Sequence, residues 1–159
     1  MAPPTTVTRP TPTGWKLPDG FRTKVGIGAN PGIQFWEKSV KPMGVDGGEP
    51  IDITTMYNTR WHTLYPKTLI KGTEMTGKAA YDPNVYPELQ AIVNMPCSMT
   101  VLFPTNATLT FYGALSKFEF GELREGEFPE ADYTIVVTNY DPINGVEQGP
   151  VYTPAPGTP

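Results

Sequence analysis

The sequence predicts a mainly β protein, either a β-sandwich or a curled antiparallel sheet, with one short flanking α-helix at about residues 87–94. Three observations support this fold class. Apolar and polar side chains alternate through residues 98–139, as they do in strands that bury one face. Proline and glycine, 19 and 16 of 159 residues, supply many turns. Aromatic residues, 11% of the chain, supply enough apolar area for one hydrophobic core.

The clearest strand pattern lies in the second half of the chain. Met99, Val101 and Phe103 alternate with Thr100 and Leu102, so the two sets point to opposite faces of a sheet. The same period of two recurs after a short turn and again after an acidic loop, which predicts a meander of half-buried strands. The predicted strands are 21–27, 33–38, 69–81, 98–103, 107–120 and 132–139, with 51–56 as a short strand or an extended loop.

The one helix that the pattern supports follows a turn at residues 81–86. Pro87 suits the first helical position, where its missing N–H costs nothing. Leu89, Ile92 and Val93 are spaced to share one apolar face, and Asn94 ends the helix. A helix of roughly two turns is not stable alone. We therefore expect its apolar face to pack on the sheet.

The chain divides into one domain and two terminal arms. Residues 21–148 form the predicted β-rich domain. Residues 1–20 and 149–159 are rich in proline, which fixes φ and withholds an N–H, so both are expected to be extended. They are either solvated tails or arms that order against neighbouring copies. Trp15 and Tyr152 are the candidate anchors for the second alternative.

Composition and charge argue against several functions. With a formal net charge of −4 and a pI near 5.0, the chain has no Lys/Arg cluster of the kind that grips nucleic-acid phosphates. A single cysteine, Cys97, excludes an intrachain disulfide and favours a reducing cytoplasm. The first residues lack the basic and apolar regions of a signal peptide. No apolar run approaches the ~20 residues of a membrane span, so we expect no membrane partner.

The reactive side chains form no catalytic constellation. His62 and Cys97 would make a nucleophilic pair, but Cys97 is more simply explained as a small residue before a strand. One Cys and one His fall short of a zinc ligand set. Carboxylates cluster in residues 119–132, where a solvated hairpin loop explains them better than glycosidase chemistry. We therefore expect no enzymatic activity, no cofactor and no metal.

The predicted sheet has too little covering of its own. One short helix covers part of one face, and exposed strand edges must be covered or paired. Other copies of the chain are the simplest cover, and a head-to-tail contact that closes produces a ring. We therefore expect a homo-oligomer.

The order of elements and several local patterns point to one family. The residues that carry the pattern are 51–56, Arg60 and Trp61, the turn and helix from Asp82, and the segments 111–115, 121–127 and 131–139. Over roughly residues 20–153, this organisation resembles the tail tube (major tail) proteins of long-tailed bacteriophages. The resemblance implies hexameric rings whose inner strands merge into one barrel around a channel. It also implies a place in the virion tail after assembly in the host cytoplasm, beside other tail proteins.

By this resemblance, residues 42–66 form a ring-stacking loop. Its candidate inter-ring contacts are Asp52, Met56, Tyr57, Arg60 and Trp61.

A tail tube must let DNA slide through without binding it specifically. Neutralised phosphates release counterions and hold DNA tightly, so a channel rich in Asp and Glu and poor in Lys and Arg avoids this. The net charge of −4 fits that requirement. The candidate channel-facing carboxylates are Glu119, Glu122, Glu125 and Glu130.

Two other classes of function stay open on the sequence alone. The chain is alternatively another virion structural protein, such as a head-decoration or tail-completion protein. It is alternatively a monomeric β-sandwich module that binds a ligand such as a sugar, with Trp15, Trp36 and Trp61 as stacking platforms.

Overall fold

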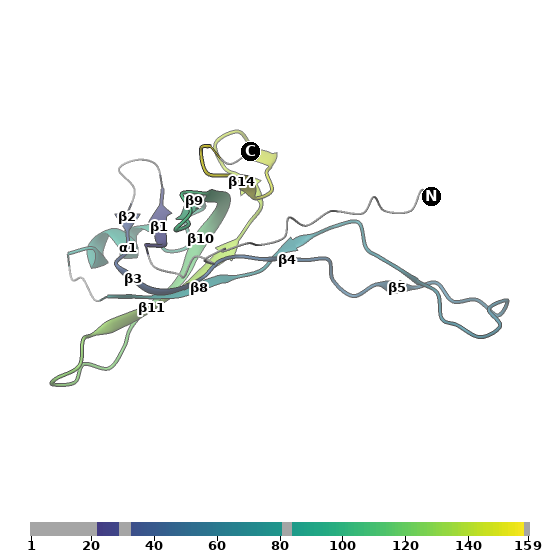
Figure 1. The fold of residues 1–159 in the computed structure, drawn as a ribbon, viewed down its shortest axis with the longest axis horizontal. Coiled ribbons are helices and arrows are strands. Elements are labelled where there is room, and N and C mark those ends of the chain that lie inside the picture. The colour runs from purple at the N-terminus through teal and green to yellow at the C-terminus, as the bar shows by residue number, and fades with distance from the viewer. Residues whose placement is uncertain (1–21, 29–32, 81–83, 158–159) are drawn as a thin grey trace.

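The computed structural model describes residues 22–28, 33–80 and 84–157, and its named strands all pair antiparallel (Figure 1). The main sheet contains β1 (Lys24–Ile27), β2 (Ile33–Gln34), β3 (Glu37–Lys41), β8 (Met75–Ala80), β9 (Cys97–Leu102), β10 (Thr108–Phe120), β11 (Glu130–Val137) and β14 (Val151–Thr153). Its strand order is β2-β1-β9-β10-β11-β8-β3, and β14 also pairs with β10. The predicted fold class, mainly β with one short helix, is confirmed.

Strand β10 links the two halves of this sheet. Its first half pairs with β9, where Phe111 lies opposite Met99, and its second half pairs with β11, where Leu115 lies opposite Ile135. Strands β9, β10 and β11 lie within two residues of their predicted bounds. Their alternation could be read correctly because each strand buries one face only.

The sheet curls so that its two halves enclose one core. The Phe35 ring, in the link between β2 and β3, stacks on Tyr133 of β11 with centroids 4.7 Å apart. Glu37 of β3 accepts a hydrogen bond from the Val25 N–H of β1 at 2.7 Å, although β1 and β3 lie near opposite ends of the strand order. The core side chains are Val25, Ile27, Phe35, Met43, Met75, Ala79, Leu89, Met99, Val101, Phe111, Leu115, Tyr133 and Ile135.

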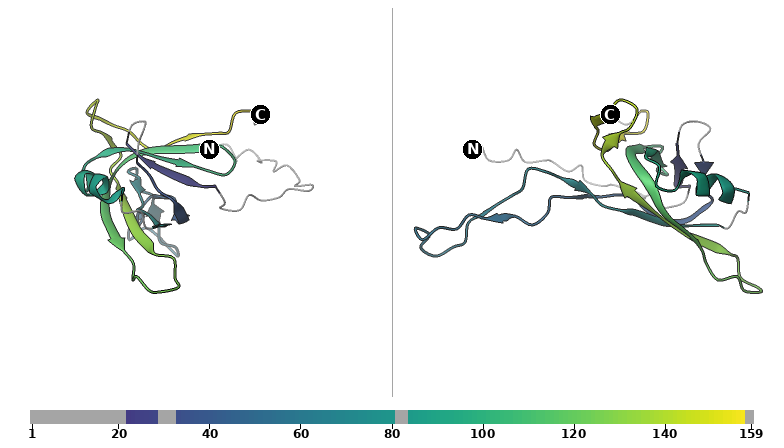
Figure 2. Two further views of the ribbon diagram at one scale, coloured as in Figure 1. Left: turned by 90° about the vertical axis from the view of Figure 1, so that its left-hand side faces the viewer. Right: turned by 180° about the vertical axis from the view of Figure 1, so that it is seen from behind.

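A β-bulge in β10 changes which residues face this core. Before it, Phe111 and Leu115 point inward; after it, Phe118 packs against the core. The register with β11 passes from Leu115 to Lys117, so Ser116 is the extra residue. A bulge bends its strand and increases the local twist. Beyond it, the β10–β11 hairpin projects from the body of the molecule (Figures 1 and 2).

The single named helix, α1 (Tyr86–Ile92), lies one residue earlier at its start and two earlier at its end than predicted. Tyr86 opens the helix, so Pro87 takes the second helical position rather than the first. Leu89 is buried against the sheet, as its spacing predicted. The helix ends early because Val93 bridges Leu115 of β10, and such a bridge needs extended backbone.

Between β3 and β8 the chain leaves the body as a long two-stranded projection, residues 43–74, which we call the arm (Figures 1 and 2). Near its base β4 (Val45–Asp46) pairs with β7 (Lys71–Gly72), and further out β5 (Ile51–Asp52) pairs with β6 (Leu64–Tyr65). The predicted strand 69–81 is therefore wrong as one element: β7 belongs to the arm and β8 to the sheet. The predicted strand 51–56 is limited to β5.

Near the C-terminus a second small hairpin pairs β12 (Tyr140–Asp141) with β13 (Val146–Glu147). We call residues 139–148 the C-terminal hairpin.

The remaining predicted strands also differ from their expected bounds. Strand β1 begins only at Lys24, and the predicted strand 33–38 divides into β2 and β3, because Phe35 turns into the core. Phe21 and Tyr81, at the ends of two predicted strands, lie outside the described residues.

Candidate functional site

The arm is a folded segment that exposes apolar side chains along most of its length. Met56 and Tyr57 at its end are 102% and 95% exposed, Trp61 is 77% exposed, and Leu69 is 82% exposed. Further exposed apolar residues are Val45, Ile51, Ile53, Leu64, Tyr65 and Ile70. A two-stranded ribbon is marginally stable alone, and clustered exposed apolar surface marks an interaction site. The arm is therefore the strongest candidate for a contact with another protein surface.

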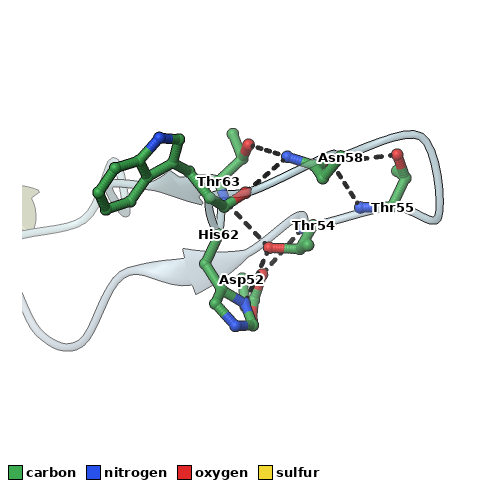
Figure 3. A network of polar contacts seen from close by, with 7 residues as sticks. Asp52, Thr54, Thr55, Asn58, His62 and Thr63 are labelled. Carbon is green, nitrogen blue, oxygen red and sulfur yellow. Dashed lines mark hydrogen bonds and ion pairs between the residues drawn. The ribbon is translucent and has the colours of Figure 1, made fainter.

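The end of the arm is nevertheless held in one conformation by hydrogen bonds (Figure 3). The Asn58 side chain accepts hydrogen bonds from the Thr55 N–H at 2.9 Å and the Thr55 hydroxyl at 3.2 Å. It donates to the Trp61 carbonyl at 2.9 Å and to the Thr63 hydroxyl at 2.8 Å. One amide thus ties together the two sides of the turn. These hydrogen bonds hold the backbone of the turn in place, and the Met56 and Tyr57 side chains are exposed to solvent.

A second group of contacts joins the two strands just behind this turn (Figure 3). The Thr54 hydroxyl accepts from the Thr63 N–H at 2.9 Å and lies 3.3 Å from His62 Nδ1. Asp52 accepts from the Thr54 N–H at 2.8 Å, and its other oxygen lies 3.4 Å from His62 Nδ1. Hydrogen bonds from Thr54, first its hydroxyl and then its N–H, lower the pKa of Asp52, and His62 adds a smaller lowering. Asp52 is therefore ionised at neutral pH.

All five predicted inter-ring residues lie in the outer part of the arm. Asp52 belongs to the hydrogen-bonded group, whereas Met56, Tyr57 and Trp61 expose their side chains. The Arg60 guanidinium lies 6.0 Å from the centre of the Trp61 ring, within the range of a cation–π contact. The structure brings these residues together at one end of the molecule. Their contact with a second ring stays a prediction.

Two of the four predicted channel carboxylates, Glu119 and Glu130, lie on the solvent side of the sheet. Glu119 and Asp132 face each other across β10 and β11, on the face away from the core. Glu119 lies 2.9 Å from Lys117. Glu130 binds Lys38 at 2.8 Å; the hydrogen bond and then the charge of Lys38 lower the pKa of Glu130.

The other two, Glu122 and Glu125, lie outside the strands in the loop that joins β10 to β11. Glu122 pairs with Arg124 at 2.7 Å. The four residues therefore do not form one uniform acidic surface: two belong to the outer face of the sheet and two to the loop between β10 and β11.

Trp15 and Tyr152 are the residues predicted to anchor the N-terminal and C-terminal segments to neighbouring copies. Trp15 lies outside the described residues. Tyr152 lies in β14, opposite Leu109 of β10, with its ring 6.4 Å from that of Phe103. It stays 61% exposed. The first part of the C-terminal segment is thus a strand of the chain's own sheet.

Sequence reasoning missed two features of these surfaces. The role of Asn58 depends on a turn conformation, although the spacing of Thr55 and Asn58 is typical of side chains that bond within a turn. The C-terminal hairpin has no counterpart among the predicted strands. In the structure Asp141, 5% exposed, accepts from the Ile143 N–H at 2.8 Å and from the Asn144 side chain at 2.6 Å. These bonds hold Ile143, 85% exposed, at the end of the hairpin.

The side chains considered for catalysis lie apart. Cys97 is half-buried in β9, where burial raises the pKa of its thiol, whereas His62 lies in the arm beside Asp52. Among the described residues, no three His, Cys, Asp or Glu side chains gather in a way that could hold a metal ion. In the same part of the chain, no helix is both long and apolar enough to cross a membrane.

No model of a known protein family matches the chain, and no curated protein matches it in sequence. Solved structures do share its fold. A chain from the virion of a native gene transfer agent particle has a TM-score of 0.62 and 8% identity, covering 86% of this chain and 99% of its own. A chain from the six-fold symmetrised baseplate of the anti-feeding prophage has a TM-score of 0.63 and 6% identity, covering 94% and 99%.

A third similar chain comes from the extended sheath–tube complex of an extracellular contractile injection system, with a TM-score of 0.61 and 12% identity over 89% of this chain and 94% of its own. At these identities the likeness concerns the fold alone. The chain therefore has a fold that is found among the chains of phage-tail-like particles.

Proposed function

We propose that this chain is a structural subunit that assembles into stacked rings, forming a tail tube through which DNA passes. The observation that carries the proposal is the arm: a preorganised projection whose apolar side chains lack any cover within the described chain. An exposed apolar surface of this kind marks a site of interaction with another protein surface. Self-assembly supplies a cover for it, and the shared fold with chains of tail particles supports the same conclusion.

The open edges of the sheet support a sideways contact between neighbouring copies in a ring. β3 ends the strand order. After its pairing with β9 ends at Gly113, β10 pairs on that edge only with Val93 and Asn94 at Leu115, so among the described strands its edge beyond Leu115 is open. Unpaired strand edges are ready to pair with another chain. We propose that the β3 edge of one copy meets the β10 edge of the next. A ring of six is favoured by the C6 symmetry applied to a gene transfer agent tail, in which a chain of similar fold (TM-score 0.59) occurs.

We propose that the outer face of β3, β8, β11 and β10 lines the channel through which DNA passes. Most of its side chains are polar, with Val136 as an exposed exception, and Glu130 and Asp132 lie 3.5 and 3.8 Å from Lys78. Lys117 lies 2.9 Å from Glu119. Carboxylates accompany Lys38, Lys78 and Lys117, whereas Lys41 at the end of β3 has no ion-pair partner among the described residues. The face therefore presents one lone lysine but no continuous basic stripe that would release phosphate counterions.

Electron microscopy of the purified chain tests the proposal. We expect hollow tubes of even bore that lengthen as the concentration rises. Light scattering that finds a stable 17.4 kDa species at every concentration would contradict self-assembly.

A variant tests the arm's part in stacking. Met56→Ser with Trp61→Ser removes two exposed apolar side chains and no core packing, so we expect folded rings that no longer stack. Met95→Ser, which changes a 57% exposed side chain near α1, is the control. Tubes of ordinary length from the double variant would exclude the arm as the stacking contact.

The channel wall has its own test. In a DNA-binding assay at ~0.15 M salt, assembled wild-type tubes should retain no DNA, whereas tubes of the Glu119→Lys variant should retain it. Glu88→Lys, in α1 and away from this sheet face, is the charge-matched control. Equal retention by the two variants would show that the face does not line the channel.

A second candidate, a tail-completion or baseplate subunit, is favoured by the similarity to a baseplate chain, at a TM-score of 0.63. Such a subunit would stop after one ring or a few, so the same micrographs distinguish it from a tube subunit. The ligand-binding alternative has less support, because Trp36 lies before β3 in the body and Trp61 lies in the arm. They do not share one stacking platform.

A further inference from the structure

The two exposed turns at the end of the arm and in the C-terminal hairpin differ in charge. The end of the arm, residues 53–63, contains Arg60 and no Asp or Glu, and Asp52 lies just behind it. The C-terminal hairpin, residues 139–148, contains Asp141 and Glu147 and no Lys or Arg. The exposed Arg60 and Glu147 are therefore available as a pair of opposite charge between copies. Complementary charge selects and orients partners in an interface.

The C-terminal hairpin combines this acidic character with exposed apolar side chains. Ile143 is 85% exposed, and Tyr140 and Val146 are 49% and 51% exposed. Glu147 lies opposite Tyr140 in the register of the hairpin and is exposed. The Asp141 hydrogen bonds fix the turn, as Asn58 fixes the end of the arm. Each turn is therefore held by its own hydrogen bonds and exposes apolar side chains, and the exposed charges Arg60 and Glu147 have opposite signs.

These two surfaces do not meet within one copy. The arm extends away from the body in Figure 1 and in the right-hand view of Figure 2, whereas the C-terminal segment lies beside the body at β10. Each side of the arm has about 13 residues, and a strand rises about 3.3 Å per residue, so the arm reaches about 40 Å. That length is comparable with the diameter of a domain of this size. An arm of this reach can cross one neighbouring copy and contact a surface on its far side.

We infer that the end of the arm of one copy binds the C-terminal hairpin of a second copy, with Arg60 opposite Glu147 and the exposed apolar side chains of the two turns between them. This inference rests on the proposed function, in which the second copy belongs to the next ring. The contact is heterologous, so each copy uses its arm once and its hairpin once. Repetition of such a contact builds an open stack rather than a closed pair.

Disulfide trapping tests the contact in the assembled protein. In a Cys97→Ser background, which removes the one native cysteine, Arg60→Cys is combined with Glu147→Cys. Because the two surfaces lie far apart within a copy, a bond between them must join two copies. After mild oxidation we expect a ladder of dimers, trimers and longer products on a denaturing gel, whereas each single-cysteine variant stays monomeric.

The outcomes separate this contact from the proposed function. Tubes in the micrographs without a ladder would overturn the contact and leave the proposed function standing. Disulfide dimers from Arg60→Cys alone would show that arms meet arms, which also overturns it. A wild-type chain that stays at 17.4 kDa overturns the proposed function and this contact together.

A charge exchange gives an independent readout. Arg60→Glu and Glu147→Arg should each raise the concentration at which assembly begins by about three- to tenfold, because each places like charges together. The two changes in one chain should restore assembly to near the wild-type concentration. Glu88→Arg is the control, since α1 belongs to neither surface. A combined variant that is as impaired as the single variants, or worse, excludes the pairing of these two residues.

Discussion

Replacing Asn58 by alanine tests whether the end of the arm is ordered before it meets a partner. The Asn58 side chain makes four hydrogen bonds, two with Thr55 and one each with the Trp61 carbonyl and the Thr63 hydroxyl. Alanine removes all four and leaves the backbone bond from the Asn58 N–H to the Thr55 carbonyl at 3.0 Å. The change touches no core side chain.

The expected loss is local. A net hydrogen bond contributes about 0.5–1.5 kcal/mol, and the lower value suits bonds that are exposed to water, so four bonds amount to about 2 kcal/mol. At about 1.4 kcal/mol per factor of ten, amide hydrogens in residues 53–63 should exchange about 30-fold faster. The body should keep its melting temperature, because the arm contributes little to the core.

Hydrogen exchange measured at a concentration below the onset of assembly checks this prediction. Thr59→Ala is the matched control: it lies in the same turn, and its side chain makes no hydrogen bond within the described part of the chain. Exchange in the Asn58 variant that stays within about twofold of the Thr59 variant would refute the reasoning. The turn would then be held by its backbone alone, and Asn58 would have no role in positioning the apolar side chains.

Two further predictions concern the body of the molecule. Gly77→Ala should lower the free energy of unfolding by about 1–3 kcal/mol, because a Cβ there would collide with the Tyr133 ring and hydroxyl. Urea unfolding measures this change. Gly26→Ala, whose Cβ would have its nearest neighbour at 4.0 Å, should lower the free energy of unfolding by less. Glu37 is the pH-dependent case: burial raises its pKa above the ordinary 4.5 despite the hydrogen bond from the Val25 N–H, so its contribution to stability falls as pH rises through the folded-state pKa. Glu37→Gln should therefore be more stable than the wild type at pH 7, and the difference should shrink toward pH 4; a difference that is constant across this range would contradict the assignment.

Sequence reasoning reached the body of the fold because local signals there report burial. Met99, Val101 and Phe111 alternate with polar residues and are all buried, and Leu89 marks the inward face of α1. The bulge in β10 also left a readable signal. The inward apolar residues change from odd to even numbers between Leu115 and Phe118, which one extra residue explains.

The arm gave no such signal, although its functional importance was predicted. Both of its faces are exposed, so apolar and polar residues have no reason to alternate, and a two-stranded ribbon looked like an irregular loop. The network around Asn58 depends on backbone angles and on a contact with Thr63 across the turn. The position of Glu130 between Lys38 and Lys78 likewise depends on pairing between strands far apart in sequence.

The bulge at Ser116 has a genetic consequence. Because it is one residue more than the β11 register requires, deletion of Ser116 alone would leave Leu115 and Phe118 on their present face and make the alternation of β10 unbroken. Deletion of Lys117 and Ser116 together would instead turn the outer half of the strand inside out. A single-codon deletion should therefore be tolerated by the core and change only the direction of the β10–β11 hairpin, while the two-codon deletion should not fold.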